Sequence, residues 1–514
     1  AAATDLRGLE TIPQTEARRA AIVQQLQETA VSTQAHLRQQ LAQWQADGKI
    51  AAYQPFWIVN AIAVTGRAET IYQLAQDPAV ARILPDSERP LISPPAADTA
   101  GYLDRVTAVT TTLSGQSWGI DRIQAPYVWH ALGVDGSGVT VAIMDSGVDW
   151  QHPALLPNYR GNLGGGQIDH AGNWYNTTMP TLTVPFDAIG HGTHVAGTAV
   201  GQNGLGVAPG AQWIAVNIAS PNGLIYDSSI HAGFQWLLAP DGDPSLAPDV
   251  INGSWGGPGW LTTFVADITA VHTAGILTVF AAGNSGPAAG SVLSPGSIPG
   301  VLAVGASDDR DEAAWFSSRG PSPLTNEIKP ALTAPGAQIL SALPGGAYGY
   351  ASGTSMATPH VAGAAALLLS ANPTLSRPDL TRILTETAVP LSATTPNMTT
   401  GWGLLNVYTA VSTQSNHGRL SGVVRSGGAP LPGVGVTITT PSGAPLAFAA
   451  EESGRYTATL QPGPYQLMAA PFGFYPASAG SLTVQTGQTT PYDVDLLRPS
   501  SGVLALSVVD ATSQ

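Results

Sequence analysis

Short apolar, β-branched runs alternate with helical stretches over residues 118–410, and this alternation constrains the fold more than any other feature of the chain. The clearest runs lie at 139–144, 213–218, 250–252, 277–281 and 301–306. Strands that alternate with helices predict a mostly parallel sheet with helices on its faces. In such a sheet, reactive groups gather at the carboxyl ends of the strands. We therefore expect an α/β domain whose site lies at that edge.

Three motifs in this region carry a carboxylate, an imidazole and a hydroxyl, in that order along the chain. Asp145 directly follows an apolar run, His191 opens a His-Gly-Thr-His motif, and Ser355 lies in Gly-Thr-Ser-Met-Ala. A serine hydroxyl is a weak nucleophile near neutral pH, so it needs a base and a partner that orients the base. We expect Ser355 to be the nucleophile, His191 the base and Asp145 its partner, while His194 packs in the helix that follows.

The residues around Ser355 and Asn284 predict a site for a developing negative charge. Ser355 is expected to begin a helix that runs through residue 370, with Pro359 in its first turn, where the missing N–H costs little. Free N–H groups at a helix start favour negative charge. Asn284 follows the run at 277–281, and its amide with the Ser355 N–H predicts an oxyanion hole. Alone, these residues are typical of a helix cap and a turn; their combination favours catalysis.

Together these motifs resemble those of the subtilisin-like serine proteases (subtilases). Further phrases fit the same family: Gly-Val-Ala-Pro-Gly-Ala at 206–211 and Gly-Trp-Gly-Leu-Leu-Asn at 401–406. The segments 118–120 and 247–257 are most similar to the bacillopeptidase F branch. The resemblance implies a three-layer subtilisin-like domain with a mostly parallel central sheet over 118–412. It also implies an Asp-His-Ser triad whose chemistry requires no cofactor.

The resemblance further implies how an extended peptide binds. The residues concerned are Ser254, Trp255, Gly256, Gly223, Ala282, Gly283 and Leu293. The first three match the segment that pairs with the peptide main chain, Gly223 lies in the opposite wall, and the last three line the first specificity pocket. Main-chain pairing holds any extended peptide, and pockets select side chains. Because the pocket residues include no carboxylate, we expect a preference for neutral or apolar side chains; Trp255 could instead be a core aromatic.

Residues 1–90 predict a small α+β unit. The pattern is helical at 15–46, β-rich at 53–64, helical at 67–76 and strand-like at 81–84. The unit resembles the subtilase propeptide, an inhibitor and folding assistant of ferredoxin-like shape. The stretch 91–117 is expected to be a linker that contains the maturation site. Residues 1–117 beside an intact triad indicate either a precursor or a propeptide that stays bound after cleavage.

The C-terminal part has a different character. Short alternating strands with Gly- and Pro-rich turns over 418–497 predict a β-sandwich, which resembles carboxypeptidase regulatory-like domains. Its role is either that of a spacer or stabilising module, or that of a binding module. Residues 498–514 are either a tail or the start of a further module.

Composition excludes several classes of function. The net charge is −14 with only two lysines, so a nucleic acid is not an expected partner. No cysteine is present, which excludes thiol catalysis and thiolate metal sites but leaves the compartment open. No run reaches the ~18 apolar residues of a membrane span.

Metal binding is left open by the sequence. Many subtilases hold a structural calcium in an insertion after the His-motif helix; here only 201–205 fills that gap, and Ala154 lies where an aspartate is expected. We expect that site to be missing, while other calcium sites are possible because loop oxygens leave little trace. Five further aspartates are expected to be solvated loop residues: Asp149, Asp187, Asp308, Asp309 and Asp311. A cation site near the last three is the alternative.

We therefore expect a secreted, monomeric serine endopeptidase that hydrolyses proteins or peptides through an acyl-enzyme. It would be made as an autoprocessed zymogen with its own propeptide as inhibitor. One alternative is a binding or adhesion protein with a vestigial protease domain, motivated by the sandwich. Another is an esterase of the α/β-hydrolase fold, which is disfavoured because that family has Gly-x-Ser-x-Gly and the order Ser…Asp…His.

Overall fold

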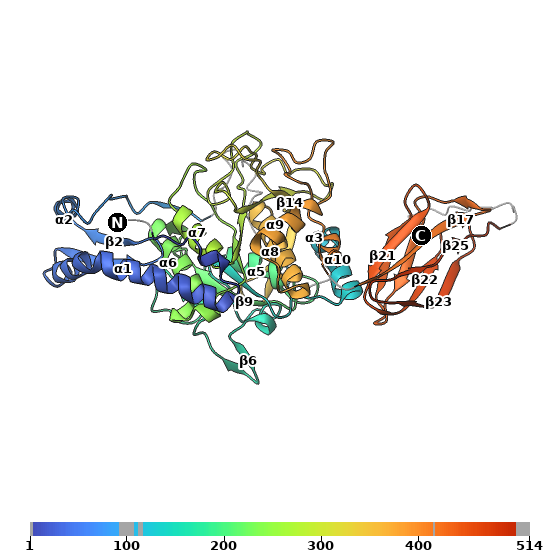
Figure 1. Ribbon diagram of the computed structural model, residues 1–514, viewed down its shortest axis with the longest axis horizontal. Helices are drawn as coiled ribbons and strands as arrows, with labels where there is room; N and C mark the ends of the chain where they lie inside the picture. The colour runs from blue at the N-terminus through green and yellow to red at the C-terminus, as the bar shows by residue number, and fades with distance from the viewer. Residues whose placement is uncertain (1–3, 92–106, 111–116, 415–416, 500–514) are drawn as a thin grey trace, which may run out of the picture. The chain divides into compact units, whose positions relative to one another are not determined.

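The computed structural model describes residues 4–91, 107–110, 117–414 and 417–499, which belong to two compact units (Figure 1). The first unit holds the described residues up to 126 together with 134–413, and the second holds 127–133 and those from 414 onward. Within these residues, no helix combines the length and apolar character needed to cross a membrane.

A seven-stranded sheet forms the centre of the first unit. Its spatial order is β14 (Leu332–Pro335), β13 (Leu302–Ser307), β12 (Leu277–Ala281), β11 (Val250–Gly253), β5 (Thr140–Asp145), β9 (Gln212–Asn217) and β8 (Trp174–Asn176). Every neighbouring pair is parallel. Strands of this kind are buried on both faces, which explains their nearly continuous apolar runs. The predicted parallel sheet and all five predicted strands are confirmed.

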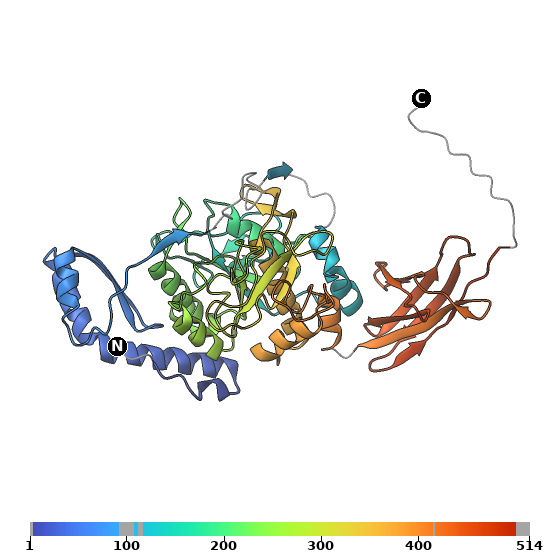
Figure 2. The same cartoon turned by 90° about the horizontal axis from the view of Figure 1, so that it is seen from above.

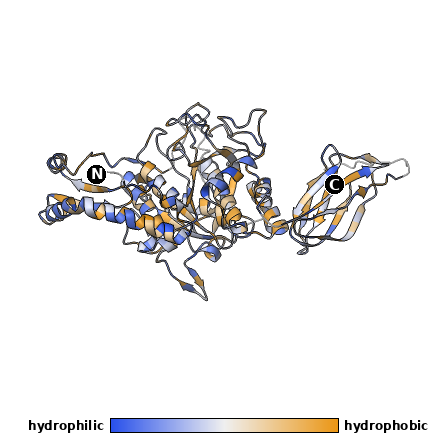
Figure 3. Cartoon of the chain, viewed as in Figure 1, coloured by the Kyte–Doolittle hydropathy of each residue, from blue (hydrophilic) through white to orange (hydrophobic). Residues whose placement is uncertain are grey.

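Helices cover both faces of this sheet. One core contains α6 (Asp227–Leu238), α7 (Val265–Thr273) and alternate strand residues such as Met144, Ile251 and Phe280. Strand neighbours point to opposite faces, and α5 (His191–Val200) and α8 (Thr354–Ala371) contribute nothing to that core. These two helices pack on each other and on the sheet. Figure 3 shows the orange, apolar colour concentrated in this central region.

The chain order of the sheet fixes where a site can form. Strand β5 lies between β9 and β11, so the chain leaves it on one side and returns on the other. The carboxyl ends of β5 and β11 therefore flank a topological switch point, the place where open α/β sheets bind ligands. Asp145 ends β5 and Gly253 ends β11.

The remaining elements of the first unit are short. The helices are α3 (Trp118–Arg122), α4 (Ala125–Tyr127, whose last residue belongs to the second unit), α9 (Arg377–Glu386) and α10 (Val407–Ser412). A three-stranded sheet has the order β15 (Ile339–Leu343), β16 (Ala347–Ala351), β4 (Thr107–Thr110), and β6 (Asn162–Gly164) pairs with β7 (Gln167–Ile168). Strand β10 (Leu224–Tyr226) pairs antiparallel with β3 (Glu88–Pro90).

The N-terminal region consists of α1 (Thr15–Ala46), β1 (Ile50–Phe56), β2 (Ala61–Gly66) and α2 (Ala68–Leu74). Helix α1 buries two apolar patches. Ile22, Val23 and Leu26 join the core of α6 and α7, whereas Leu37 and Leu41 pack with the β1 hairpin and α2. The blue helix α1 accordingly lies against the green part of the chain in both views (Figures 1 and 2).

The predicted small α+β unit is confirmed, and one expectation within it was wrong. Strands β1 and β2 form a two-stranded sheet, and β3 pairs with β10 instead of the hairpin. The strand expected at 81–84 is absent: Ile83 and Leu84 are 43% and 54% exposed without a pairing partner, and the strand forms at Glu88–Pro90. Most of the proposed 91–117 linker lies outside the described residues.

The second unit is a β-sandwich, as predicted. One sheet contains β17 (Gly418–Ser426), β18 (Ala429–Pro430), β21 (Arg455–Leu460), β24 (Thr489–Pro491) and β25 (Val494–Asp495). The other has the order β20 (Pro445–Ala449), β19 (Gly435–Thr439), β22 (Gly463–Ala469), β23 (Ala477–Val484). Alternate residues are buried, as β22 shows. The suggested tail or further module from 498 lies almost wholly outside the described residues.

Three buried histidines predict acid sensitivity of the first unit. Burial lowers the pKa of His194 and His272 to about 3 and that of His360 to about 4. Unfolding restores a pKa near 6.5, so the unfolded state binds protons that the folded state excludes. The stability that these groups contribute is present above pH 6.5 and is lost as the pH falls toward 4. For each histidine, the free energy of unfolding falls by about 1.4 kcal/mol per pH unit.

We expect the urea midpoint of the inactive Ser355→Ala protein to fall steeply between pH 6.5 and 4.5, while the ring resonances of these histidines stay those of neutral imidazole. Ring resonances that titrate near pH 6.5 in the folded protein would contradict this account.

Candidate active site

Asp145 and His191 meet at the carboxyl end of the sheet. Asp145 is the last residue of β5, and His191 is the first residue of α5, after Gly190 with a φ of 92°. The His191 Nδ1–H donates to Asp145 Oδ1 over 2.7 Å, and both side chains are buried. The backbone N–H of Ser146 donates to the same oxygen over 2.7 Å. The strand end and the helix start therefore hold the imidazole in one tautomer and orientation.

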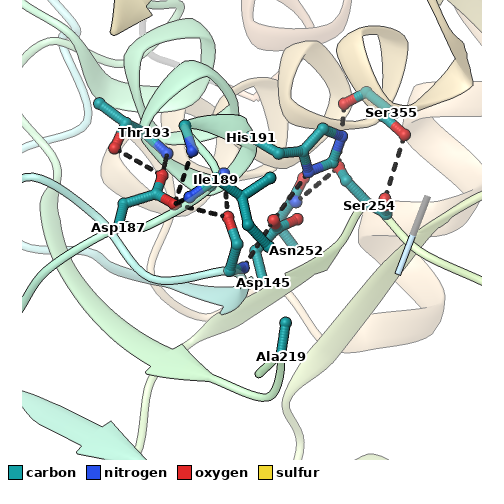
Figure 4. A network of polar contacts seen from close by, with 12 residues as sticks. Asp145, Asp187, Ile189, His191, Thr193, Ala219, Asn252, Ser254 and Ser355 are labelled. Atoms are coloured by element: carbon teal, nitrogen blue, oxygen red, sulfur yellow. Dashed lines mark hydrogen bonds and ion pairs between the residues drawn. The ribbon is translucent and has the colours of Figure 1, made fainter. Parts of the chain in front are cut away.

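Ser355 lies on the other side of the imidazole. Figure 4 shows the His191 ring between Asp145 and Ser355. The Ser355 Oγ donates to the Ser254 carbonyl over 3.0 Å, and the Ser254 Oγ donates back to the Ser355 carbonyl over 2.9 Å. Asn252 Nδ2 donates to Ser254 Oγ over 3.0 Å. The end of β11 and the start of α8 are thus joined directly at the serine.

The start of α8 differs from the prediction. The helix begins at Thr354, and Pro359 lies beyond its first turn, inside the helix. A proline there cannot donate to the carbonyl four residues earlier, which is that of Ser355. A buried carbonyl requires another donor, and the Ser254 hydroxyl is that donor. The position of Pro359 inside the helix therefore explains the contact between Ser254 and Ser355.

Asn284 is oriented by the residue before the serine. Its Oδ1 accepts from the Thr354 backbone N–H over 2.9 Å and from the Thr354 Oγ1 over 3.0 Å. These contacts fix the carboxamide plane and place its NH₂ group on the side away from Thr354. Such an orientation matches that of an oxyanion donor. Thr354 was not singled out in the sequence, because only its contact with Asn284 distinguishes it.

One pocket adjoins Ser355 and Asn284. It is lined by Leu91, Ser254, Trp255, Gly256, Ala281, Gly283, Asn284, Leu293, Thr354 and Ser355. It therefore contains five of the seven residues expected to bind substrate. Ala282 is not among them: it is fully buried, and its N–H and carbonyl bond Val304 and Leu293. Gly223 is not among the lining residues either; its carbonyl accepts over 2.8 Å from the N–H of Leu91, which lines the pocket.

Trp255 is both a wall of the pocket and a core residue. Its ring is 2% exposed and packs edge-on against Phe264 and Phe280, with centroids 5.9 and 5.2 Å away. The ring therefore lines the pocket from the core, and a role in binding substrate stays a prediction.

Asp187 is a site residue that sequence reasoning missed. It is not a solvated loop carboxylate: it accepts from the backbone N–H groups of Ile189, Gly190 and Thr193 and from the Thr193 hydroxyl, over 2.7–3.0 Å. It also accepts from Ser146 Oγ over 2.9 Å, and that oxygen accepts from Gly192 N. Burial raises the pKa of Asp187, and its donors oppose the rise. Figure 4 shows Asp187 joining the ends that carry Asp145 and His191; only its place four residues before His191 hinted at this.

We expect Asp187→Asn to destabilise the first unit by about 2–3 kcal/mol, because an amide turns one acceptor oxygen into a donor facing other donors. Displacement of His191 should also lower kcat by about tenfold. Urea unfolding in a Ser355→Ala background and peptide hydrolysis in the active protein measure the two effects. Asp169→Asn is the matched control, since that exposed carboxylate bonds only a nearby backbone N–H. Equal effects of the two substitutions would contradict this role.

The other aspartates have local roles. Asp311 forms a two-bond ion pair with Arg122, and Asp308 Oδ1 accepts from nearby backbone N–H groups. In the part of the chain that the structure describes, no three His, Asp or Glu side chains lie together as a metal site.

Near residues 201–205, where the structural calcium of other subtilases was considered, Asn158 Nδ2 donates to the Val200 and Pro209 carbonyls. The Gln202 side chain donates to Asn158 and Pro209. The absence of calcium at this place and its binding elsewhere both stay predictions.

The carboxylate, the imidazole and the helix-start serine occur in this order along the chain, and a seven-stranded parallel sheet between helices carries them. This combination defines the class of subtilisin-like serine peptidases. Sequence comparison agrees. The subtilase family model matches residues 136–403, and the carboxypeptidase regulatory-like domain model matches residues 419–497. The chain therefore belongs to the subtilase family, whose chemistry needs no cofactor.

Named relatives cover different shares of the chain. Bacillopeptidase F of Bacillus subtilis (strain 168) is 39% identical over 420 residues, which are 77% of this chain but only 29% of that protein. Subtilisin E of the same strain is 36% identical over 362 residues, 69% of this chain and 81% of the relative. Subtilisin of Bacillus pumilus is 39% identical over 300 residues, 57% of this chain and 98% of the relative.

Proposed function

We propose that the protein is an endopeptidase that cleaves peptide bonds through an acyl-enzyme on Ser355. His191 takes the proton from the Ser355 hydroxyl as it attacks the scissile carbonyl, and later gives it to the leaving amine. Asp145 stabilises the imidazolium through the 2.7 Å contact at Nδ1. Asn284 and the Ser355 N–H receive the charge on the carbonyl oxygen. The observation that carries the proposal is the geometry of the site: Asp145 holds the His191 ring beside Ser355, and Ser355 and Asn284 line one pocket.

The N-terminal region is proposed to be an intramolecular inhibitor of this site. Strand β3 pairs with β10, and Leu91 is 1% exposed in the pocket that also contains Ser355. A second anchor lies far from the cleft: Arg19 donates to the carbonyls of Ala247 and Pro248 over 2.8 Å and pairs with Asp249. These contacts support a propeptide in residues 1–90, removed by self-cleavage within 91–117.

Extended peptides of protein substrates are proposed to take the same path as β3 after processing. Main-chain pairing with β10 would hold them, as in β-strand addition. The apolar lining of the pocket supports a neutral or apolar side chain next to the scissile bond. Secretion and action as a monomer complete the proposal, on the strength of the family resemblance.

The test is covalent labelling. A fluorophosphonate probe should label the purified protein at one peptide that contains Ser355, and the same preparation should hydrolyse casein. The Ser355→Ala protein should show neither property. Labelling that persists in Ser355→Ala, or a labelled peptide elsewhere in the chain, would refute the assignment. Absence of labelling and hydrolysis in the wild type after removal of residues 1–117 would favour a vestigial site.

A further inference from the structure

Strand β3 occupies the cleft and places its cationic side chain, Arg89, in a specific set of contacts that we call the cradle. In β3 and at the residue that follows it, Arg89 and Leu91 are buried, whereas Glu88 and Pro90 are exposed. Alternation along an extended strand explains this pattern, because every second side chain points into the enzyme. Two side chains of the occupant are therefore recognised, and Arg89 lies two residues before the apolar one.

Three groups form the cradle of Arg89. Its guanidinium pairs with Asp227, the first residue of α6, and both side chains are largely buried. The guanidinium carbon lies 5.5 Å from the centre of the Phe264 ring, within the range of a cation–π contact. The stem of Arg89 passes over Gly257, where a Cβ would come within 3.1 Å of the Arg89 Cδ.

Each component suits an arginine. A carboxylate forms charge-assisted hydrogen bonds with a guanidinium, an aromatic face attracts its positive plane, and the missing side chain at Gly257 leaves room for the stem. When Arg89 departs, Asp227 loses its only ion-pair partner among the described residues, next to an aromatic ring. The cradle is then a preformed acidic site beside the path of an extended peptide.

We propose that Asp227, Phe264 and Gly257 form a substrate subsite for arginine, so that the enzyme prefers extended peptides with Arg two residues before an aliphatic side chain. This inference rests on the proposed function, because it assigns substrates to the path that β3 now occupies. The subsite selects a charged residue at a distance from the scissile bond, whereas the pocket beside Ser355 selects an uncharged one.

The test compares internally quenched peptides that contain Arg-Pro-Leu followed by four alanines. A matched peptide replaces Arg by citrulline, which keeps the shape but lacks the charge. The wild-type protein should cleave the Arg peptide with a kcat/KM about 10- to 100-fold higher, as expected for hydrogen bonds to a charged group. In Asp227→Asn this ratio should fall close to one. In Asp243→Asn, a matched loss of an exposed carboxylate that bonds only Ser245, the ratio should stay high.

Equal cleavage of the two peptides by the wild type would overturn the proposal and leave the cradle as an anchor for Arg89 alone. A binding measurement separates this outcome from failure of the proposed function. The full chain with Ser355→Ala, Arg89→Ala and Leu91→Ala cannot hydrolyse peptides, and its own strand fits the cleft poorly. Fluorescence anisotropy with the labelled peptides should show about tenfold tighter binding of the Arg form. Equal affinities there would overturn the subsite even if no peptide is cleaved.

Discussion

Replacement of Ser355 by alanine is expected to lower kcat for peptide hydrolysis by about 10⁶-fold, the loss measured for the corresponding substitution in subtilisin, a relative of this protein. The physical reason is that the remaining groups can bind and polarise a substrate but cannot form the acyl-enzyme. His191→Ala should cost a similar factor. The double variant should be no worse than either single one, because the serine and its base act as a unit.

A control for this prediction lies on the same helix. The Ser370 hydroxyl donates to the Ser137 carbonyl over 2.9 Å, far from the pocket, so Ser370→Ala should keep near-normal kcat. The measurement is the initial rate of cleavage of a quenched peptide, corrected for contaminating proteases with the double variant. A loss of less than about a hundredfold in Ser355→Ala would contradict the account.

Replacement of Asn284 by leucine is expected to lower kcat by about 10²–10³-fold with little change in KM; this range comes from the asparagine of subtilisin, again a relative. Leucine keeps the size of the side chain but removes the donor that faces the developing oxyanion. Because the donor is needed in the transition state rather than in the ground state, the loss should appear in kcat.

Thr354 offers a finer version of the same test. Its hydroxyl and backbone N–H both donate to Asn284 Oδ1. Thr354→Val removes one of the two contacts and should lower kcat by roughly tenfold. Thr354→Ser keeps the hydroxyl and should restore most of the activity. A rise in KM at constant kcat in Asn284→Leu would indicate a role in substrate binding instead.

Much of the fold could be predicted because it depends on local patterns. The apolar runs at 139–144 and 277–281 are buried on both faces, which leaves a signal that requires no knowledge of their neighbours. The helix at 15–46 was predicted to its last residue by its periodic apolar positions. The strand at 88–90 could not be found, since β10, its partner among the described residues, lies more than 130 residues away and its outward side chains are polar or proline.

The same difference between local patterns and contacts made only in the folded chain applies to the site. Asp145, His191, Asn284 and Ser355 stand in motifs whose residue types are linked to one chemistry, so the sequence could indicate them together. Asp187 stands in no motif, and its role depends on five hydrogen bonds that only the folded chain creates. The partners of buried groups likewise could not be read from residue type: His194 was expected to pack in its helix, but its contacts with the carbonyls of Ile339 and Gly349 exist only in the folded chain.

The central claim is that Ser355 is the nucleophile of a protease that processes its own N-terminal region. The most direct measurement is the intact mass and N-terminal sequence of the full chain, purified as wild type and as Ser355→Ala under identical conditions. The account predicts a new N-terminus within residues 91–117 in the wild type and an uncut chain in Ser355→Ala. The same cut in both proteins, or none in either, would contradict it.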